Sequence, residues 1–179
     1  DLLENGKLNI VRRPSGGSAV LHSGGLTYSF VLPSERKSKN KNYFYNCQWL
    51  IKAFQELGIS LKFGEKKQNL LIENCFTTST PADLIDSHGH KRIGSAQLWK
   101  NKHLLQHGEI LLDPSRDLWE EVFESKPPEA LPSYFKRKNI EKLLVKNFTS
   151  FYPTFKWKKR SLTEEEMVYI SQIAIKYKY

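Results

Sequence analysis

Two strand-like segments joined by a short polar turn constrain the fold of this chain most. Residues 90–97 contain a run of very small side chains after Lys91, residues 104–112 are apolar and strand-like, and a Lys-Asn-Lys-His turn lies between them. Polar turn residues between two β-rich runs indicate a β-hairpin. We therefore predict a hairpin in which the small residues 94–96 face His107 and Gly108 on the partner strand.

The small residues of this hairpin leave room for a ligand chain against the backbone. None of the three side chains at 94–96 is larger than a hydroxymethyl group, and Lys91 would stand at the mouth of such a groove. An ordinary hairpin with a small-residue bulge and a solvated lysine explains the same local pattern. From these residues alone both readings stay open.

The N-terminal part also has a β-rich pattern with strong turn signals. Residues 8–13, 19–22 and 26–32 are separated by Pro-Ser-Gly-Gly and Ser-Gly-Gly. Proline and paired glycines are typical of turns, so we predict an antiparallel meander of three strands. His22 would then lie on the middle strand.

The remaining periodic segments predict helices and short strands around the hairpin. Aromatic and aliphatic residues at helical spacing predict a helix over 42–57, with Gly58 as its C-terminal cap. Thr163 precedes three glutamates, which favours an N-cap there. The further expected elements are strands at 59–63, 70–72 and 83–86 and helices at 116–125, 139–151 and 163–177.

Length and composition indicate a single domain in a reducing compartment. The chain has 179 residues, 39% of them hydrophobic, and contains only two cysteines. That number does not make a disulfide framework, and no apolar run approaches the roughly 20 residues that span a bilayer. We expect a cytoplasmic monomer with no membrane association. Because the chain starts at Asp1 and enters a strand-like segment directly, we expect that an N-terminal segment is missing.

The net charge of +9 requires an explanation. A nucleic acid, an acidic protein partner steered by the positive field, and a solvated lysine-rich surface all fit this charge. The basic residues are scattered rather than gathered in one motif, which disfavours nucleic acid. Two histidines near 90 lack further ligands at metal spacing, so we predict no metal site.

The two cysteines occupy different sequence environments. Cys47 lies among aromatic residues of a predicted helix, which favours a role as core filler. Cys75 stands where an apolar strand gives way to a hydroxyl-rich loop, and loops of this kind often carry nucleophiles. A nearby ammonium such as Lys91 would favour its thiolate form. An inert thiol remains the alternative.

Taken in order, these motifs resemble a known family. The runs R-R-x-S-G-G-x-A-V-x-H from Arg12 to His22, K-x-x-G-S-A from Lys91 to Ala96, and H-G at 107–108 are similar to those of the lipoate-protein ligase and octanoyltransferase family. The resemblance implies an α+β fold with a mixed, mostly antiparallel sheet flanked by helices, like class II aminoacyl-tRNA synthetases and biotin ligases.

The resemblance also implies a set of site residues. Lys91 matches the family's active-site lysine, and Ser18 departs from the family because many ligases carry a third glycine there. The residues matched to the walls of the acyl or adenylate pocket are Arg13, Ser15, Gly16, Gly17 and His22 on one side and Gly94, Ser95, Ala96, His107 and Gly108 on the other.

Within the family, the Asn-Cys-Phe segment around Cys75 resembles the cysteine-dependent octanoyltransferases, and Gln97 fits that branch as well. The resemblance implies transfer of an octanoyl or lipoyl group from acyl carrier protein to a lysine of an acidic lipoyl-domain protein, through a thioester on Cys75 and without a cofactor. In that reading no nucleic acid takes part. Lys91 would lower the pKa of the thiol and polarise the acyl carbonyl.

Two alternatives remain open from the sequence. One is an ATP- and Mg-dependent lipoate-protein ligase that forms an acyl-adenylate on the same fold. The helices expected after Asp113 are short for the accessory domain that many ligases carry, which disfavours this reading. The other is a noncatalytic basic module that binds RNA.

Overall fold

The computed structural model describes residues 8–33, 39–64 and 83–178 of the chain. The predicted strand at 70–72 and the loop around Cys75 lie outside these residues. The described chain falls into two compact units, residues 15–152 and a smaller unit formed by 1–14 with 153–179. Each unit is described by itself below.

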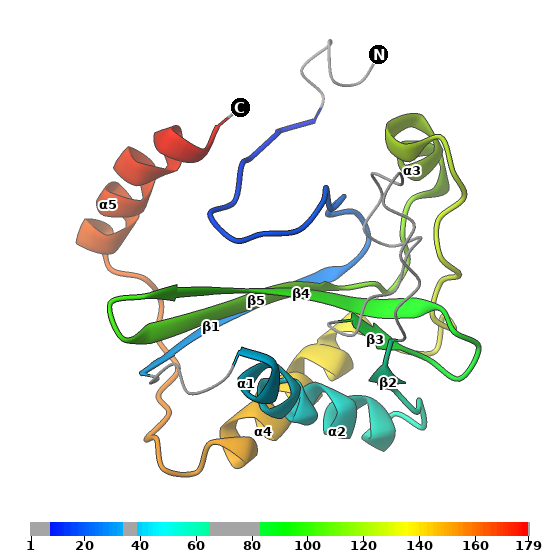
Figure 1. Cartoon of the computed structure of the whole chain (residues 1–179), viewed down its shortest axis with the longest axis horizontal. Helices are drawn as coiled ribbons and strands as arrows, with labels where there is room; N and C mark the ends of the chain where they lie inside the picture. The colour runs from blue at the N-terminus through cyan, green and yellow to red at the C-terminus, as the bar shows by residue number, and fades with distance from the viewer. Residues whose placement is uncertain (1–7, 34–38, 65–82, 179) are drawn as a thin grey trace. The chain divides into compact units, whose positions relative to one another are not determined.

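A five-stranded sheet forms the centre of the larger unit (Figure 1). All its neighbouring strands are antiparallel, in the order β1-β5-β4-β3-β2. The strands are β1 (Leu26–Pro33), β2 (Lys62–Phe63), β3 (Asp83–Ile85), β4 (Lys91–Lys100) and β5 (His103–Ile110). This architecture confirms the predicted α+β fold class with a mostly antiparallel sheet.

The central hairpin is confirmed in its predicted register. Ser95 of β4 lies opposite Gly108 of β5, and Ala96 lies opposite His107. The turn between the strands has Asn101 and Lys102, both with positive φ, of 50° and 59°. Two successive residues of this kind match the right-handed twist of the strands, which fixes the register of a two-residue hairpin.

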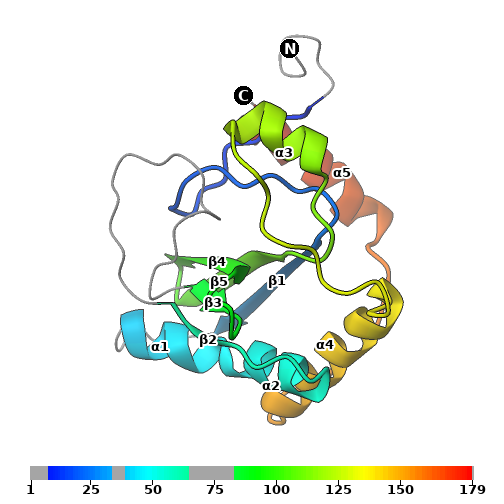
Figure 2. The same cartoon turned by 90° about the vertical axis from the view of Figure 1, so that its right-hand side faces the viewer.

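Four helices belong to the same unit: α1 (Lys39–Asn46), α2 (Gln48–Glu56), α3 (Arg116–Phe123) and α4 (Arg137–Phe151). Figures 1 and 2 show α1, α2 and α4 on one side of the sheet. We call the sheet face toward them the helix face, and the opposite face the site face. α3 instead packs through Trp119 against Leu21 and Leu111.

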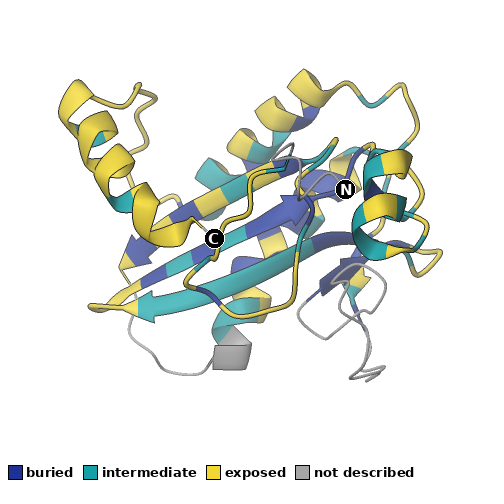
Figure 3. Cartoon of the chain, turned by 90° about the horizontal axis from the view of Figure 1, so that it is seen from above, coloured by how far each residue is buried: buried dark blue, intermediate teal, exposed yellow. Residues whose placement is uncertain are grey.

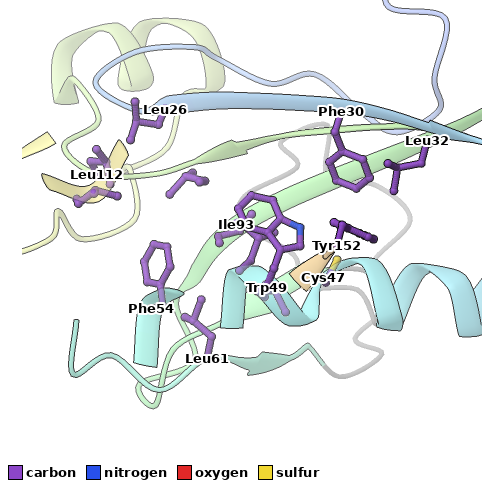
Figure 4. Close-up of a cluster of buried hydrophobic side chains, with 14 residues drawn as sticks. Leu26, Phe30, Leu32, Cys47, Trp49, Phe54, Leu61, Ile93, Leu112 and Tyr152 are labelled. Atoms are coloured by element: carbon purple, nitrogen blue, oxygen red, sulfur yellow. The ribbon is translucent and has the colours of Figure 1, made fainter. Parts of the chain in front are cut away.

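The hydrophobic core lies between the helix face and these helices. Figure 4 shows Phe30, Ile93 and Trp49 among the side chains of this core. Leu26, Phe30 and Leu32 alternate along β1, so the residues between them point to the site face. Cys47 is fully buried in this cluster, which confirms its predicted role as core filler.

Two predicted elements are corrected by the structure. Residues 8–13 and 19–22 are not strands of the sheet, so the predicted N-terminal meander is wrong. Residues 15–22 instead run along the site face, where their side chains bond those of β5. The predicted helix over 42–57 is two helices, α1 and α2, with Cys47 in a turn between them. Gly58 has a φ of +77°, as expected of a glycine after a helix.

The smaller unit contains the helix α5 (Glu164–Ala174) and the short 3-10 helix η1 (Ile175–Tyr177). Val11 forms an isolated antiparallel bridge with Lys178, which ties the two ends of this unit together. Thr163 caps α5 in a capping box with Glu166, as the sequence predicts. No residue of α5 is buried (Figure 3). Within the described residues, no helix is long and apolar enough to cross a membrane.

Candidate active site

A bulge in β4 places Lys91 on the site face. Leu84 pairs with Ile93, but Ile85 pairs with Lys91, so Arg92 is an extra residue in β4. Without this bulge the two-residue alternation of a strand would put Lys91 on the same face as Ile93, in the core. The extra residue turns Lys91 to the face that carries Gly94 and Ala96.

Lys91 forms a buried ion pair with Asp83 at the start of β3. Its Nζ lies 2.8 Å from Asp83 Oδ1, and each side chain is only 6% exposed. A buried ammonium is costly unless a counter-charge and hydrogen bonds compensate it, and Asp83 supplies both. The pair carries no net charge as a whole. The electrostatic potential at this point of the site face therefore depends on both Lys91 and Asp83.

Gly94 lies in a row of four residues that crosses the sheet. Thr27 pairs with Glu109, Glu109 with Gly94, and Gly94 with Asp83. Gly94 has no side chain, so in this row only its backbone lies between Glu109 and Asp83. In the next row, Ala96 and His107 are cross-strand partners on the same face. Of the predicted small residues, Gly94 and Ala96 thus adjoin Lys91 on the site face.

The Ser-Gly-Gly segment reaches the site face through Ser15. The Ser15 hydroxyl and His107 Nε2 are 2.5 Å apart, and Ser15 is buried. Gly17 has a φ of +104°, which favours glycine there. A methyl group added at Gly16 would meet no atom within 4 Å, so the space beside its backbone is open.

His22 is held by a buried carboxylate. Its Nδ1 lies 2.7 Å from Glu109 Oε2, and the Thr27 hydroxyl donates to the same oxygen over 2.8 Å. The Glu109 side chain is 2% exposed, whereas the imidazole of His22 is 55% exposed. The site face therefore carries two charge-bearing pairs, His22 with Glu109 and Lys91 with Asp83, on either side of Gly94.

Two of the predicted site residues face the core instead. Ser95 Oγ bonds Tyr28 OH over 2.6 Å, and the Cβ position of Gly108 points at Tyr28 and the backbone of Gly94. Strand alternation is the reason, because each lies one residue from a site-face residue. These two residues can line the site face only with their backbone.

A polar network supports β4 and β5 from the helix face. Gln106 Nε2 donates to Tyr28 OH over 3.1 Å and reaches Cys47 Sγ over 3.5 Å, while Gln97 donates to Gln106 Oε1 over 2.7 Å. Burial raises the pKa of Tyr28, and it raises the pKa of the Cys47 thiol to about 12. Cys47 is therefore a protonated core residue at neutral pH and is not suited to be a nucleophile.

The roles of two predicted site residues stay predictions. Cys75 lies outside the described residues, so its role stays a prediction. Arg13 belongs to the smaller unit. In the described part of the chain, no cluster of three or more His, Cys, Asp or Glu side chains could hold a metal ion.

Sequence reasoning missed Asp83 and Glu109, the two carboxylates that bond Lys91 and His22 on the site face. A usable signal was present at both positions. Each acid interrupts an otherwise apolar strand, Asp83 before Leu84-Ile85 and Glu109 before a run of Ile and Leu. An acid in such a strand is rarely buried without a partner, so it indicates a cation on the same face.

A five-stranded antiparallel sheet with helices packed on one face and a buried lysine–aspartate pair on the other makes this an α+β domain. The whole of this sheet lies within residues 1–155, which match the lipoyl protein ligase A/B catalytic domain family. The chain belongs to this family.

Curated relatives are octanoyltransferases. The octanoyltransferase LipM of Geobacillus kaustophilus is 31% identical over 196 residues, covering 93% of this chain and 70% of that protein. LipM of Bacillus subtilis is 31% identical over 159 residues, covering 79% of this chain and 57% of that protein. The chain thus spans between about half and 70% of the length of these relatives.

Solved structures of lipoate-protein ligases share the fold. Lipoate-protein ligase A bound with ATP aligns with a TM-score of 0.78 at 20% identity, over 98% of this chain and 70% of that chain. A lipoate-protein ligase of T. acidophilum, described as putative and bound with lipoic acid, aligns with a TM-score of 0.79, also at 20% identity and over the same shares. These matches confirm the fold that the sequence motifs implied.

Proposed function

We propose that this chain transfers an octanoyl group, or the related lipoyl group, from acyl carrier protein to a lysine of a lipoyl-domain protein. The acyl group would pass through a thioester on Cys75, and no cofactor would take part. The relatives named octanoyltransferase support this choice of reaction. The structural observation that carries it is the buried Lys91–Asp83 pair beside Gly94 on the site face.

The reaction divides into two acyl transfers. In the first, the Cys75 thiolate attacks the thioester carbonyl of the carrier, a new C–S bond forms, and the carrier leaves as a thiol after taking up a proton. In the second, the lysine amine attacks the enzyme thioester, a C–N bond forms, and the C–S bond to Cys75 breaks. Two steps suit this exchange because the thioester on Cys75 holds the acyl group while one carrier replaces the other.

Lys91 has the properties needed to assist both steps. In each step negative charge develops on the carbonyl oxygen, and a fixed ammonium stabilises such charge. The ion pair with Asp83 fixes Lys91 in position before substrate arrives, so little reorganisation is needed. Gly94 and Ala96 add only hydrogen and methyl groups to the same face, which leaves space for an apolar acyl chain along β4.

The overall charge fits carrier proteins as partners. Acyl carrier protein and lipoyl domains are acidic in general, and a net charge of +9 would steer their encounter with this chain. One related ligase structure is described together with its E2 lipoyl domain, which supports such a partner for the family. We place the reaction in the reducing cytoplasm, with the chain acting as a monomer.

An acyl-enzyme experiment tests the proposal. The chain is incubated with octanoyl-acyl carrier protein, and the intact protein is measured by mass spectrometry. We expect an octanoyl adduct that hydroxylamine removes, that Cys75→Ala abolishes and that Cys47→Ala retains. The second variant is the matched control, because Cys47 is fully buried. An adduct that persists in Cys75→Ala would contradict the thioester mechanism.

ATP-dependent ligation is the second candidate. The ATP-bound ligase of the same fold favours it, and so does the open space where a Cβ would stand at Gly16, since glycine allows close approach of a phosphate. Here ATP with Mg would be a substrate, and the acyl-adenylate would form from the free acid. Transfer of free octanoate to a lipoyl domain only when ATP and Mg are added would support this ligase over the transferase. Salt-dependent RNA binding with no acyl transfer under either condition would instead favour the noncatalytic module.

A further inference from the structure

Arg92, the extra residue of the β4 bulge, is a buried charge that the proposed reaction does not use. Its Nε donates to Asp86 Oδ2 over 2.7 Å, and its guanidinium also donates to the backbone carbonyl of Glu129. Burying a charge is costly unless a counter-charge and hydrogen bonds compensate it. Both are present here, so the guanidinium is held from two directions.

Asp86 connects this guanidinium to the turn between β3 and β4. Its Oδ1 accepts the backbone N–H groups of His88 and His90, each over 2.9 Å, and its own N–H donates to the His90 carbonyl over 3.0 Å. One oxygen of the carboxylate thus binds the turn, and the other binds Arg92. Lys91 stands between His90 and Arg92 in the chain, so Asp86 bonds the residue on each side of it.

The bulge is also bonded to the segments that follow β5. The Arg92 carbonyl accepts the N–H of Leu111 over 2.9 Å. The Glu129 carbonyl that Arg92 binds belongs to the connector between α3 and α4, and in this connector the Leu131 N–H donates to the Leu112 carbonyl over 2.6 Å. All of these residues belong to the larger unit. Arg92 therefore links the bulge to two neighbouring segments.

A regular strand competes with the bulged one at this point. In regular pairing Lys91 would share the core face with Ile93, away from Asp83. We propose that Arg92 and Asp86 are positioning residues, because their buried pair holds the bulge and so keeps the Lys91 ammonium beside Asp83 on the site face. For catalysis this inference rests on the proposed function, which gives Lys91 its role at the acyl carbonyl. An ordinary structural ion pair, which affects stability alone, is the competing explanation.

A neutral double variant separates these explanations. Removing one charge alone would leave the other buried, whereas removing both avoids this cost. Arg92→Met with Asp86→Asn does so, and the asparagine oxygen can still accept the two N–H groups of the turn. The matched control is Arg116→Met with Glu120→Gln, an exposed pair whose charged atoms lie 2.8 Å apart. Arg92→Lys, which keeps the charge, is a second test variant.

The Lys91 ammonium gives a readout that needs no acyl transfer. Buried and paired with Asp83, it should exchange its protons slowly and give a signal in lysine-selective ¹H–¹⁵N NMR, assigned by its loss in Lys91→Met. In the neutral double variant this signal should move or be lost through faster exchange. In Arg92→Lys it should change in the same sense but less, and in the control it should stay in place. An unchanged signal in both folded Arg92 variants would overturn the positioning role.

The rate of acyl-enzyme formation gives a second readout. It is measured with octanoyl-acyl carrier protein at a temperature well below the unfolding midpoint of each variant, so that only folded protein reacts. In the neutral double variant we expect the rate constant at saturating carrier to fall about 10- to 100-fold, the size of effect that a misplaced catalytic group causes. The half-saturating carrier concentration should stay within about twofold, because Arg92 acts through Lys91 and not on carrier binding. A rate constant equal to that of the parent would show an ordinary structural pair.

The two readouts fail separately. If the parent chain forms no acyl-enzyme, the proposed function fails, while the Lys91 signal still decides whether the buried pair positions this lysine. If the parent forms the acyl-enzyme and the Lys91 signal and the rate are the same in the variants, the positioning role fails and the proposed function stands.

Discussion

Asp83 and Lys91 lie on neighbouring antiparallel strands with their charged atoms 2.8 Å apart and each side chain 6% exposed. Because the pair is buried, removing one charge leaves the other in the interior without this counter-ion. We expect Asp83→Asn to lower the free energy of unfolding by about 3 kcal/mol, as for other broken buried pairs. Urea denaturation at pH 7 measures this loss.

The matched control for Asp83→Asn is an exposed pair of equal length. Arg116 Nε and Glu120 Oε1 also lie 2.8 Å apart, but their side chains are 66% and 43% exposed. Solvent screens such pairs, so Glu120→Gln should change the stability little. Equal losses in the two variants would contradict the importance of burial at Asp83.

The backbones of Gly94 and Gly108 approach too closely to admit a side chain at position 108. A methyl group added there would clash with the Gly94 carbonyl oxygen, which is backbone and cannot turn away. Gly108→Ala should therefore lower the free energy of unfolding by about 1–3 kcal/mol, the usual range for overpacking. Gly16→Ala is the control, because its methyl would meet nothing within 4 Å. A stability of Gly108→Ala equal to that of Gly16→Ala would refute the close packing of β4 and β5.

Cys47 makes stability depend on alkaline pH. Burial raises its pKa in the folded chain to about 12, whereas an unfolded cysteine has a pKa of about 8.5. Because the pKa is raised, the contribution of the protonated Cys47 thiol to the free energy of unfolding is complete below about pH 8.5. It is lost as the pH rises toward 12. Unfolding free energies measured from pH 7 to 10 should fall more steeply for the parent than for Cys47→Ala, by at most about 1.4 kcal/mol per pH unit. Parallel pH curves for the parent and Cys47→Ala would contradict the burial of the Cys47 thiol.

Glu166 makes the start of α5 sensitive to acid. Both Arg160 guanidinium nitrogens lie 2.6 Å from its carboxylate, and these bonds lower the pKa of Glu166 to about 2. Because this pKa is lowered in the folded chain, ionised Glu166 stabilises the capping box at pH values above about 4.3, the pKa of an unfolded glutamate. This stabilisation disappears as the pH falls toward 2. An NMR titration should show Arg160→Ala raising this pKa, and Lys159→Ala should change it much less. High salt should reduce the shift because the group is exposed.

The local pattern of the sequence predicted much of the fold. The hairpin turn, the glycine after α2, the cap at Thr163 and the helices after residue 115 all depend on near neighbours in the chain. Segments whose bonds go to distant residues were predicted less well. Residues 15–22 looked like a strand by composition, but they bond side chains on β5 instead of joining the sheet.

The sequence by itself determined the family and the small-residue strand beside Lys91, because motif order and side-chain size are written in the chain. Only the tertiary structure decided which face each residue occupies. One extra residue, Arg92, turns Lys91 from the core to the site face, and a bulge leaves no mark in strand periodicity. The partners Asp83 and Glu109 followed from strand register, which pairs residues far apart in sequence and so depends on the whole sheet.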